Sequence, residues 1–429
     1  MEPIRVGLLG LGVVGGGTFK VLARNAEEIA RRAGRHIVAT KVSARDVAKA
    51  KSRVGEAAEV VADPFQIVRD PELIGVDTLA RELVLEAIAH GKHVVTANKA
   101  LLAKHGNEIF ARASEQGVMV AFEAAVAGGI PIIKAIREGL SANQIEWVAG
   151  IINGTTNFIL TEMRARGLPF SEVLAEAQRL GYAEADPTFD IEGVDAAHKL
   201  TLLSSIAFGV PIRFDKAHIE GISRLAQEDI RYAEELGYRI KLLGITKARP
   251  EGIELRVHPT LIAAQRVMAN VEGAMNAVMV KGDAVGATLY YGQGAGEEPT
   301  ASAVVADLVD VTRLHTADPE HRVPHLAFQP DAITDRPMLS IEDITTSYYL
   351  RLAATDQPGV LADITRILAD ASISIVSMIQ KPREDATQAD IIFLTHEALE
   401  RNVNAAIARI EALPTVVSTV TRLRIENLA

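Results

Sequence analysis

Short apolar runs rich in β-branched residues alternate with helical patterns over residues 1–130. Strands are predicted at residues 4–9, 37–42, 93–96 and 118–122, and helices at residues 14–31, 83–90 and 109–115. Strands that are separated by helices usually pair in parallel, with the helices covering the faces of the sheet. The pattern therefore predicts an α/β domain with a doubly wound, Rossmann-type parallel sheet.

The middle of the chain, residues 131–315, mixes longer amphipathic helices with strands. Helices are predicted at residues 171–180, 196–207 and 227–235, and strands at residues 145–152 and 253–259. This mixture is typical of an α+β domain, which we expect to be the substrate-binding and dimerisation domain. Residues 316–347 carry four prolines among polar residues and are predicted to be a linker.

Residues 348–429 are predicted to form a third, smaller domain. The pattern gives strands at 348–353, 373–380, 389–396 and 416–425, with helices at 359–371 and 399–412. The resulting order βαββαβ is that of a ferredoxin-like domain.

Composition narrows the class of protein. The chain of 429 residues is 48% apolar and 23% charged, with a net charge of −10 and no cysteine. An acidic chain is a poor partner for nucleic acid, and no run approaches the ~20 apolar residues of a membrane span. The absence of cysteine excludes disulfides and thiol nucleophiles, and suits a cytoplasmic protein.

A glycine-rich turn follows the first predicted strand. Its sequence is GLGVVG, which comprises Gly10, Gly12, Val13, Val14 and Gly15 around Leu11. The first glycine permits a tight turn, the second a close approach to a pyrophosphate, and the third close helix packing. In this context the motif favours a dinucleotide site in residues 1–130. The alternative is a turn that serves packing alone.

The residues after the second predicted strand bear on cofactor choice. An acid there usually binds the ribose 2′-hydroxyl of NAD, whereas this strand is followed by Arg45 and further lysines and arginines. A guanidinium suits a 2′-phosphate, so the sequence favours NADP. Asp46 leaves NAD open, and an ordinary solvated charge cluster is the alternative to both.

Two further runs place lysines and carboxylates in apolar surroundings. Thr96 and Lys99 follow a predicted strand, at the edge of a parallel sheet where ligands bind. Asp195 and Lys199 are four residues apart on one helical face, and Glu184 lies on the loop before them. The carboxylates are candidates for holding a substrate ammonium, and the lysines for proton transfer. A surface ion pair and a surface lysine are the alternatives.

Glu123 begins the run EAAVAGGIP, in which a carboxylate stands among small residues. Such a run leaves backbone carbonyls free to bind a hard cation. A simple glycine–proline entry into a helix is the better interpretation from these residues alone.

Taken together, these motifs resemble the homoserine dehydrogenase family along nearly the whole chain. The matching blocks are GLGVVG (10–15), GKHVVTANKALLA (91–103), EAAVAGGIPII (123–133), GIINGTTNFIL (150–160), GYAEADPTFDIEGVDAAHKL (181–200) and GQGAGEEPTASAV (292–304). The resemblance implies an NAD(P)-dependent enzyme that interconverts L-homoserine and L-aspartate 4-semialdehyde. It would act in threonine, methionine and isoleucine biosynthesis.

The family also implies roles for particular residues. By analogy, Glu184 and Asp195 hold the substrate, and Lys199 and Lys99 are the proton-transfer candidates. Glu123 with the carbonyls of Val126, Gly128 and Ile130 resembles the family's sodium site. Further cofactor contacts are expected at Gly294 and Gly296.

The last 82 residues resemble an ACT domain, the amino-acid-sensing module of many biosynthetic enzymes. Its loop between the first strand and helix carries the predicted regulatory residues Asp356, Gly359, Val360 and Leu361. A free helix N-terminus there would face an amino-acid carboxylate, and L-threonine is the implied effector. A dimerisation domain without ligand is the alternative, and a homodimer or homotetramer is expected in either case.

One segment departs from the family. Where the family has a full strand followed by two glycines, this chain has only residues 70–78, so about half a dozen residues are missing by comparison. We predict a shortened, strained strand or an altered cofactor cleft.

The short segment keeps a second function open, namely a catalytically impaired relative that serves as an amino-acid-binding regulatory protein. An aspartate-semialdehyde dehydrogenase is excluded, because its acyl intermediate requires a thiol.

Overall fold

The computed structural model describes residues 2–77, 80–383 and 387–428, so Thr78 of the predicted short segment lies outside the described residues. The chain forms two compact units that interleave along the sequence. The first comprises residues 1–154, 195–217 and 274–336, and the second residues 155–194, 218–273 and 337–429. These units do not follow chain order, and the predicted division at 130, 315 and 347 stays a prediction.

The first unit contains the predicted parallel sheet. Among the described residues it has the order β3 (Glu59–Val61), β2 (Ile37–Ser43), β1 (Ile4–Leu9), β4 (Gly75–Asp77), β5 (His93–Val95) and β6 (Val120–Ala121). All five pairings are parallel. The strand order reverses at β1, which places a crevice at the carboxyl ends of β1 and β4. The predicted Rossmann-type fold is confirmed.

Helices flank this sheet with boundaries that differ from the prediction in two places. They are α1 (Val13–Arg24), α2 (Ala26–Ala33), α3 (Val47–Val54), α4 (Phe65–Val68), α5 (Arg81–Ala89) and α6 (Lys99–Glu115). The single helix predicted at 14–31 is wrong, because the backbone leaves the helical region at Asn25. The helix predicted to start at residue 109 starts ten residues earlier, where the Asn98 side chain accepts the Leu101 N–H at 3.0 Å.

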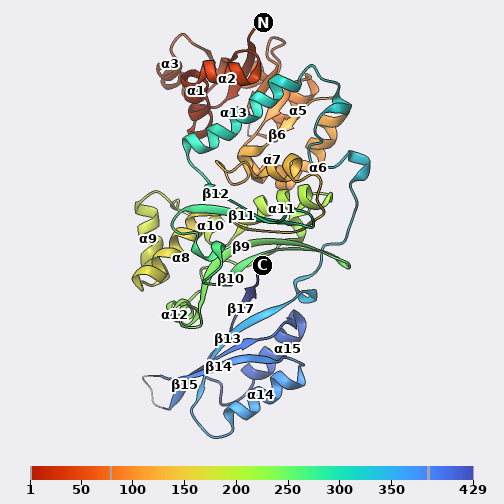
Figure 1. Ribbon diagram of the computed structural model, residues 1–429. Coiled ribbons are helices and arrows are strands. Elements are labelled where there is room, and N and C mark those ends of the chain that lie inside the picture. The colour runs from red at the N-terminus through yellow and green to blue at the C-terminus, as the bar shows by residue number, and fades with distance from the viewer. Residues whose placement is uncertain (1, 78–79, 384–386, 429) are drawn as a thin grey trace. The chain divides into compact units, whose positions relative to one another are not determined.

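A helix from the second half of the sequence completes the core of this sheet. Helix α13 (Glu297–Leu314) lies beside α1 in Figure 1, and its residues Ala301, Val304 and Leu308 belong to the same buried cluster as Val6 and Leu8. A Cβ at Gly17 of α1 would lie only 2.7 Å from the Glu297 carbonyl oxygen. Glycine at this position therefore lets the two helices pack closely.

The short strand predicted near residue 75 is confirmed. Strand β4 has three residues, Gly75–Asp77, paired with β1 on one side and β5 on the other. Non-glycine residues with positive φ occur in the described chain only at Ala127, Ala327 and Ser372, so the predicted strain does not take that form in β4. The shortened strand instead buries Asp77, a carboxyl group, in the centre of the sheet.

The remainder of the first unit carries the site described below. It contains a 3₁₀ turn at Glu123–Ala125, α7 (Ile132–Lys134), a π turn at Ala135–Gly139, β7 (Ile145–Ile151), β11 (Met275–Gly282), β12 (Gly286–Gln293) and most of α11 (Val194–Phe208). Strand β11 pairs antiparallel with β7 and with β12. The strand predicted at 145–152 and the helix predicted at 196–207 are confirmed within two residues at each end. Residues 316–336 hold only short 3₁₀ turns at Pro319–His321 and Pro330–Ala332.

The second unit begins with helices α8 (Gly154–Arg166), α9 (Phe170–Arg179), α10 (Thr188–Ile191) and α12 (Gln227–Glu235). Its strands β9 (Tyr238–Arg249) and β10 (Gly252–Ala263) form a long antiparallel hairpin, and the short β8 (His218–Ile219) pairs with β10. The strand predicted at 253–259 extends to Ala263, because almost all of β10 is buried and its polar residues pair with one another.

The C-terminal part of this unit has the predicted βαββαβ order. It comprises β13 (Thr345–Thr355), α14 (Val360–Asp370), β14 (Ile375–Pro382), β15 (Gln388–Thr395), α15 (Glu400–Glu411) and β17 (Thr421–Glu426), with a short extra strand β16 (Ala398–Leu399). The sheet order is β17-β13-β15-β14, and β17 continues onto β10 through a parallel pairing. The last strand starts at Thr421 rather than 416, because Val416 forms only an isolated bridge with Ala354.

None of the described helices is both long and apolar enough to cross a membrane.

Candidate active site

The glycine-rich turn has the geometry that its motif predicts. Gly10 has φ +113°, a conformation that side chains disfavour, and it turns the chain from β1 toward α1. A Cβ at Gly15 would lie 2.0 Å from the Gly10 carbonyl oxygen, so only glycine allows the helix to start there. Gly12 precedes the first residue of α1, and Val13 is 65% exposed. The first N–H groups of α1 are thus available to an anion.

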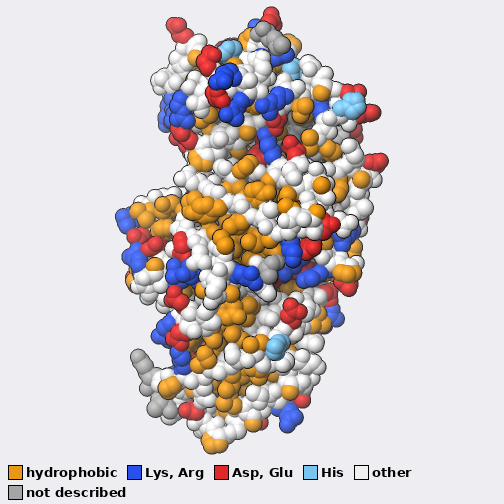
Figure 2. Space-filling view, in the orientation of Figure 1, with side chains coloured by type: hydrophobic (Ala, Val, Ile, Leu, Met, Phe, Trp, Pro, Cys, Tyr) orange, Lys and Arg blue, Asp and Glu red, His pale blue; other side chains and the backbone are white. Residues whose placement is uncertain are grey.

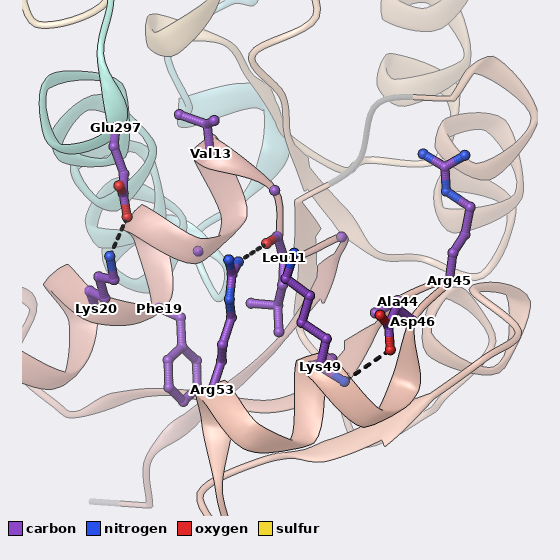
Figure 3. A pocket seen from close by; sticks show the side chains of 14 residues that line it. Leu11, Val13, Phe19, Lys20, Ala44, Arg45, Asp46, Lys49, Arg53 and Glu297 are labelled. Carbon is purple, nitrogen blue, oxygen red and sulfur yellow. Dashed lines mark hydrogen bonds and ion pairs between the residues drawn. The ribbon is translucent and has the colours of Figure 1, made fainter.

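A groove of about 670 Å³ lies along this turn. Figure 3 shows that its wall combines the turn, the start of α1 and the segment from Ala44 to Arg53. Lys20 of α1 pairs with Glu297 of α13 at 2.6 Å on the same wall. The groove therefore joins the phosphate-binding turn to the residues that follow β2, as a dinucleotide requires.

The charged residues after β2 divide into engaged and free groups. Asp46 caps α3 by accepting the Lys49 N–H at 2.9 Å, and Arg53 donates to the Leu11 carbonyl at 2.8 Å. Arg45 is exposed and has no hydrogen bond or ion pair to the described residues (Figure 3). Asp46, the acid that left NAD binding possible, thus has a structural role. Arg45, the arginine that favours NADP, is free.

A second group of side chains meets around Asp195, near the start of α11. Lys199 Nζ lies 2.6 Å from Asp195 Oδ2, and Lys99 Nζ lies 3.1 Å from Asp195 Oδ1. Lys199 also donates to the Ile152 carbonyl at 2.7 Å, and Asn153 Nδ2 donates to Asp195 Oδ2 at 2.9 Å. We call Asp195, Lys199, Lys99 and Asn153 the Asp195 cluster.

Local structure explains how these residues meet. Asp195 and Lys199 share a face of α11, as their spacing predicted. Lys99 is the first residue of α6, just beyond the carboxyl end of β5, and Asn153 follows the end of β7. Burial alone would raise the pKa of Asp195, but the two ammonium groups hold it well below its ordinary range. The cluster is therefore one buried carboxylate between two cations.

His198 lies on the same helix and is 1% exposed, with its ring 4.3 Å from that of Phe214 between centroids. Burial, aided by nearby Lys104, lowers its pKa to about 4, so the imidazole is neutral at physiological pH. Glu184 belongs to the second unit, where it is exposed on the loop between α9 and α10. The Asp195 cluster lies wholly in the first unit.

Glu123 is 1% exposed and caps the short helix α7. Its two carboxylate oxygens accept the N–H groups of Ile133 and Lys134 at 2.8 and 2.9 Å, and its own N–H donates to Asp307 at 2.8 Å. Burial, and then the charge of Asp307, raises its pKa to about 7. Burial likewise raises the pKa of Asp307 to about 6.

The turn after Glu123 fits a cation in part. Ala127 and Gly128 have φ of 55° and 42°, a reversal that turns successive carbonyls in different directions. The Ile130 carbonyl already accepts the Ile132 N–H at 2.8 Å. Each carboxylate oxygen of Glu123 accepts one N–H group and can still accept a further interaction.

The predicted glycines of the last cofactor block pack against this turn. A Cβ at Gly128 would lie 2.6 Å from the Gly294 carbonyl oxygen, and Gly129 N–H donates to the Gln293 carbonyl at 3.0 Å. Gly296, with φ +129°, starts α13. Thr96 is fully buried at the end of β5, where its hydroxyl accepts the Asn98 N–H at 3.1 Å.

The predicted regulatory loop lies in the second unit. Asp356 accepts a hydrogen bond from Gln380 at 3.0 Å, and Gly359, with φ +96°, starts α14. The Val360 side chain is 5% exposed and Leu361 packs on the same core, so these two side chains point inward.

Sequence reasoning missed two residues of these sites. Asn153 lies in a block that the resemblance marked, and a polar residue directly after a buried strand was the available signal. Asp307 lies within α13, more than 180 positions from Glu123, and nothing in its surroundings along the chain indicates the contact.

Comparisons with known proteins agree with this architecture. Residues 131–309 match the model of the family described as homoserine dehydrogenase, residues 10–123 match its NAD-binding domain, and residues 348–415 match the ACT domain. The chain is 62% identical to a homoserine dehydrogenase of Pseudomonas aeruginosa, with both chains covered in full. This chain belongs to the homoserine dehydrogenase family.

Further relatives of the family give the same result. A homoserine dehydrogenase of Neisseria gonorrhoeae is 57% identical, again with both chains covered in full. The crystal structure of a homoserine dehydrogenase from Thiobacillus denitrificans superposes with a TM-score of 0.96 at 68% identity, covering 100% of this chain and 99% of that one. The predicted enzyme class, an oxidoreductase that uses a nicotinamide cofactor and carries an ACT domain, is confirmed.

Proposed function

We propose that this chain interconverts L-homoserine and L-aspartate 4-semialdehyde in the cytoplasm, within threonine, methionine and isoleucine biosynthesis. The observation that carries the proposal is the Asp195 cluster, in which one buried carboxylate holds two lysine ammonium groups within 3.1 Å. Oxidation of an alcohol requires a group that accepts the hydroxyl proton, and reduction of the aldehyde requires a group that returns it.

In this mechanism the nicotinamide cofactor, when bound, supplies the hydride chemistry. In its neutral amine form, Lys199 or Lys99 accepts the proton of the homoserine hydroxyl and becomes an ammonium group. In the reverse direction that ammonium group returns the proton to the aldehyde oxygen. Asp195 orients both lysines, since each of its oxygens accepts a hydrogen bond or an ion pair from one of them. Glu184 remains the predicted partner of the substrate ammonium, together with Asp195.

We infer a preference for NADP. Arg45 is a free cation beside a groove whose acid, Asp46, already caps a helix. Its guanidinium would pair with a 2′-phosphate. The N–H groups at Gly12, Val13 and Val14 would bind the pyrophosphate, with Thr96, Gly294 and Gly296 as further predicted contacts.

Sodium remains a proposed ligand of Glu123 and the carbonyls of Val126, Gly128 and Ile130. A bound cation would add to the positive charge of Lys134 and offset the repulsion that the buried Glu123 carboxylate meets when it ionises beside Asp307. Its function would be structural, because it would fix the turn that packs against Gly294.

We propose that the chain forms a homo-oligomer and that L-threonine acts at the loop of Asp356 and Gly359. Figure 2 shows apolar side chains gathered over the C-terminal sheet, where Val376 and Met378 of β14 are 56% and 41% exposed. An edge strand with exposed apolar residues favours pairing with a second copy.

The test is the initial rate of NADP⁺ reduction, followed at 340 nm, with full-length protein and L-homoserine. We expect a rate that saturates in homoserine and that falls by ~10²-fold or more in Lys199→Ala or Lys99→Ala. In this direction the base must be deprotonated, so the variant in which kcat/KM no longer rises with increasing pH identifies the proton-transfer lysine. Lys281→Ala, whose lysine pairs loosely with Glu146 at 3.6 Å, is the matched control and should keep the full rate.

The second candidate function is an impaired relative that only senses amino acids. The three-residue β4 and its buried Asp77 favour it, because this strand lies beside the cofactor crevice. Folded protein that binds NADP⁺ but shows no rate with NADP⁺ or NAD⁺ would select this function and overturn the first.

A further inference from the structure

A second groove, of about 780 Å³, lies within the second compact unit. It is formed by the segment from Ile219 to Leu225, by the C-terminal half of α15 and by β17. Its volume exceeds the 670 Å³ of the cofactor groove. None of its described lining residues belongs to the predicted cofactor, substrate, metal or regulatory sites, so its occupant is unassigned.

Part of the groove wall is a closed ionic network. Glu220 accepts hydrogen bonds from Arg422 at 3.0 Å and from both terminal nitrogens of Arg424 at 2.9 and 3.0 Å. Glu400 pairs with the same two arginines. The pKa of Glu220 is well below its ordinary range although burial opposes this, because His218 and Arg424 donate to it. These charges neutralise one another and are not available to a ligand.

Four other polar side chains that line the groove have no hydrogen bond or ion pair within the described chain. They are Arg224, Ser223, Glu192 and Thr419. Arg224 and Ser223 are exposed, and a Cβ at Gly221 would lie 2.5 Å from Glu192 Oε2, so the Glu192 carboxylate lies over that glycine. Glu411 uses one oxygen to accept the Val420 N–H at 2.7 Å.

The rest of the lining is apolar and comes from all three elements. It includes Ile219, Leu225, Pro259, Ile407, Val420 and Leu423. A groove with one free cation, free carboxylate oxygens and an apolar wall matches a small zwitterion with a side chain. Two carboxylates against one free guanidinium make a phosphate or a nucleotide an unfavourable occupant.

We propose that this groove binds a free α-amino acid, at a site separate from the loop of Asp356 and Gly359. The Arg224 guanidinium pairs with the ligand carboxylate, and Glu192 with its ammonium group. The ligand side chain packs on the wall formed by Ile219 and Leu225, and the Ser223 hydroxyl is available to a polar side chain.

The groove lies close along the chain to the loop that carries Glu184, the predicted substrate-binding residue. Gly221 packs directly on Glu192, since a Cβ there would lie 2.5 Å from the Glu192 Cα atom. Ile222 N–H donates to the Ile191 carbonyl at 2.8 Å. Ile191 ends α10, which follows the loop that carries Glu184. A ligand held by Glu192 would therefore contact the residue directly after α10, the helix that follows the loop of Glu184.

The binding test uses isothermal titration calorimetry on full-length protein. The probes are L-threonine, L-methionine and L-lysine, whose side chains are hydroxylated, apolar and cationic. We expect at least one probe to bind, and Arg224→Ala and Glu192→Gln each to weaken it by ~10-fold or more. The matched control is Arg409→Ala, an exposed arginine of α15 that pairs with Asp370 and does not line the groove.

Asp356→Asn separates the two candidate sites. Binding that survives Asp356→Asn and fails in Arg224→Ala supports the groove, and the reverse pattern overturns it. No binding of any probe to folded protein also overturns it. The proposal concerns binding alone, so a protein that binds the probe without oxidising homoserine would contradict the proposed function and leave the groove intact.

Discussion

Two places in the first compact unit where carboxyl groups are buried differ in the charges that surround them. In the Asp195 cluster, one carboxylate lies between two lysines and its pKa is lowered. In the second place, which we call the acidic cluster, Asp77 ends β4 within the parallel sheet, and its charge is coupled to that of Asp307, which contacts Glu123. Burial, and then the charge of Asp307, raises the pKa of Asp77 and of Glu123 to about 7.

The difference shows what burial does to an acid when its partners differ. A buried carboxylate with cations within 3.1 Å stays charged and holds them in place. A buried carboxylate beside another acid holds a proton near neutral pH, and its ionisation costs stability. The first arrangement suits proton transfer, whereas the second makes the fold sensitive to pH and to added cations.

The largest expected effect is the loss of activity in Asp195→Asn. The amide cannot neutralise Lys199 and Lys99, so the two ammonium groups repel each other and leave their positions. We expect kcat to fall by ~10²-fold or more, with little change in the thermal midpoint relative to the activity loss. Initial rates with L-homoserine and circular dichroism melting measure the two quantities.

The control for this variant is Asp283→Asn. Asp283 is also in the first unit, but it accepts only a backbone N–H, from Gln144 at 2.9 Å, at an exposed position. An unchanged kcat in Asp195→Asn would mean that the cluster serves packing alone.

Some features of the first unit could be predicted from the sequence, because they depend on the spacing of residues that are close along the chain. The pairing of Asp195 with Lys199 follows from a spacing of four residues in a helix, and the turn at Gly10–Gly15 follows from a motif whose glycines have steric reasons. The short β4 followed from a count of residues. These features depend on neighbours along the chain, and the structure confirms them.

The remaining contacts join distant segments, and no periodicity encodes them. Lys99 reaches Asp195 because β5 and α6 end near α11, and Asn153 joins them from the end of β7. The contact of Glu123 with Asp307 depends on α13 packing under the sheet, which the chain order did not indicate. The early start of α6 was missed because the Asn98 side chain sets it by capping the helix, and no apolar pattern marks that position.

A second prediction removes the cation of the acidic cluster. Lys134 Nζ lies 2.5 Å from Asp310 and 3.8 Å from Asp307, so Lys134→Met leaves both acids without it. We expect a loss of about 2 kcal/mol in the free energy of unfolding at pH 8, and a smaller loss at pH 5, where Asp307 with its pKa of about 6 is mostly protonated. Urea unfolding at the two pH values measures this. An equal loss at both would show that only the lysine stem matters.

In a third prediction the free energy of unfolding at pH 8 rises instead of falling. Acids with a raised folded-state pKa stabilise the fold below their unfolded pKa, near 4, and this stability is lost as the pH rises through 6 to 7. Asp307→Asn removes one of these acids and its repulsion of Glu123 and Asp77. We expect the variant to gain about 1–2 kcal/mol at pH 8 and to lose part of the pH dependence between pH 5 and 8. Asp310→Asn, at the partly exposed neighbour, is the control. A destabilised Asp307→Asn at pH 8 would mean that attraction to Lys134 outweighs the repulsion.

The smallest effect, and the one that separates the two clusters most directly, is that of sodium. A cation bound at Glu123 stabilises the ionised carboxylate, so replacing choline chloride by sodium chloride at constant ionic strength should raise stability at pH 8. The gain is about 1.4 kcal/mol when the sodium concentration is roughly ten times its Kd. At pH 5, where Glu123 with its pKa of about 7 is protonated, the gain should disappear. Glu123→Gln should abolish the gain at pH 8, whereas Asp195→Asn should keep it, because the carboxylate of the Asp195 cluster already has its two cations. A sodium effect that persists in Glu123→Gln would assign the ion to another place in the molecule and leave the acidic cluster to depend on its protons.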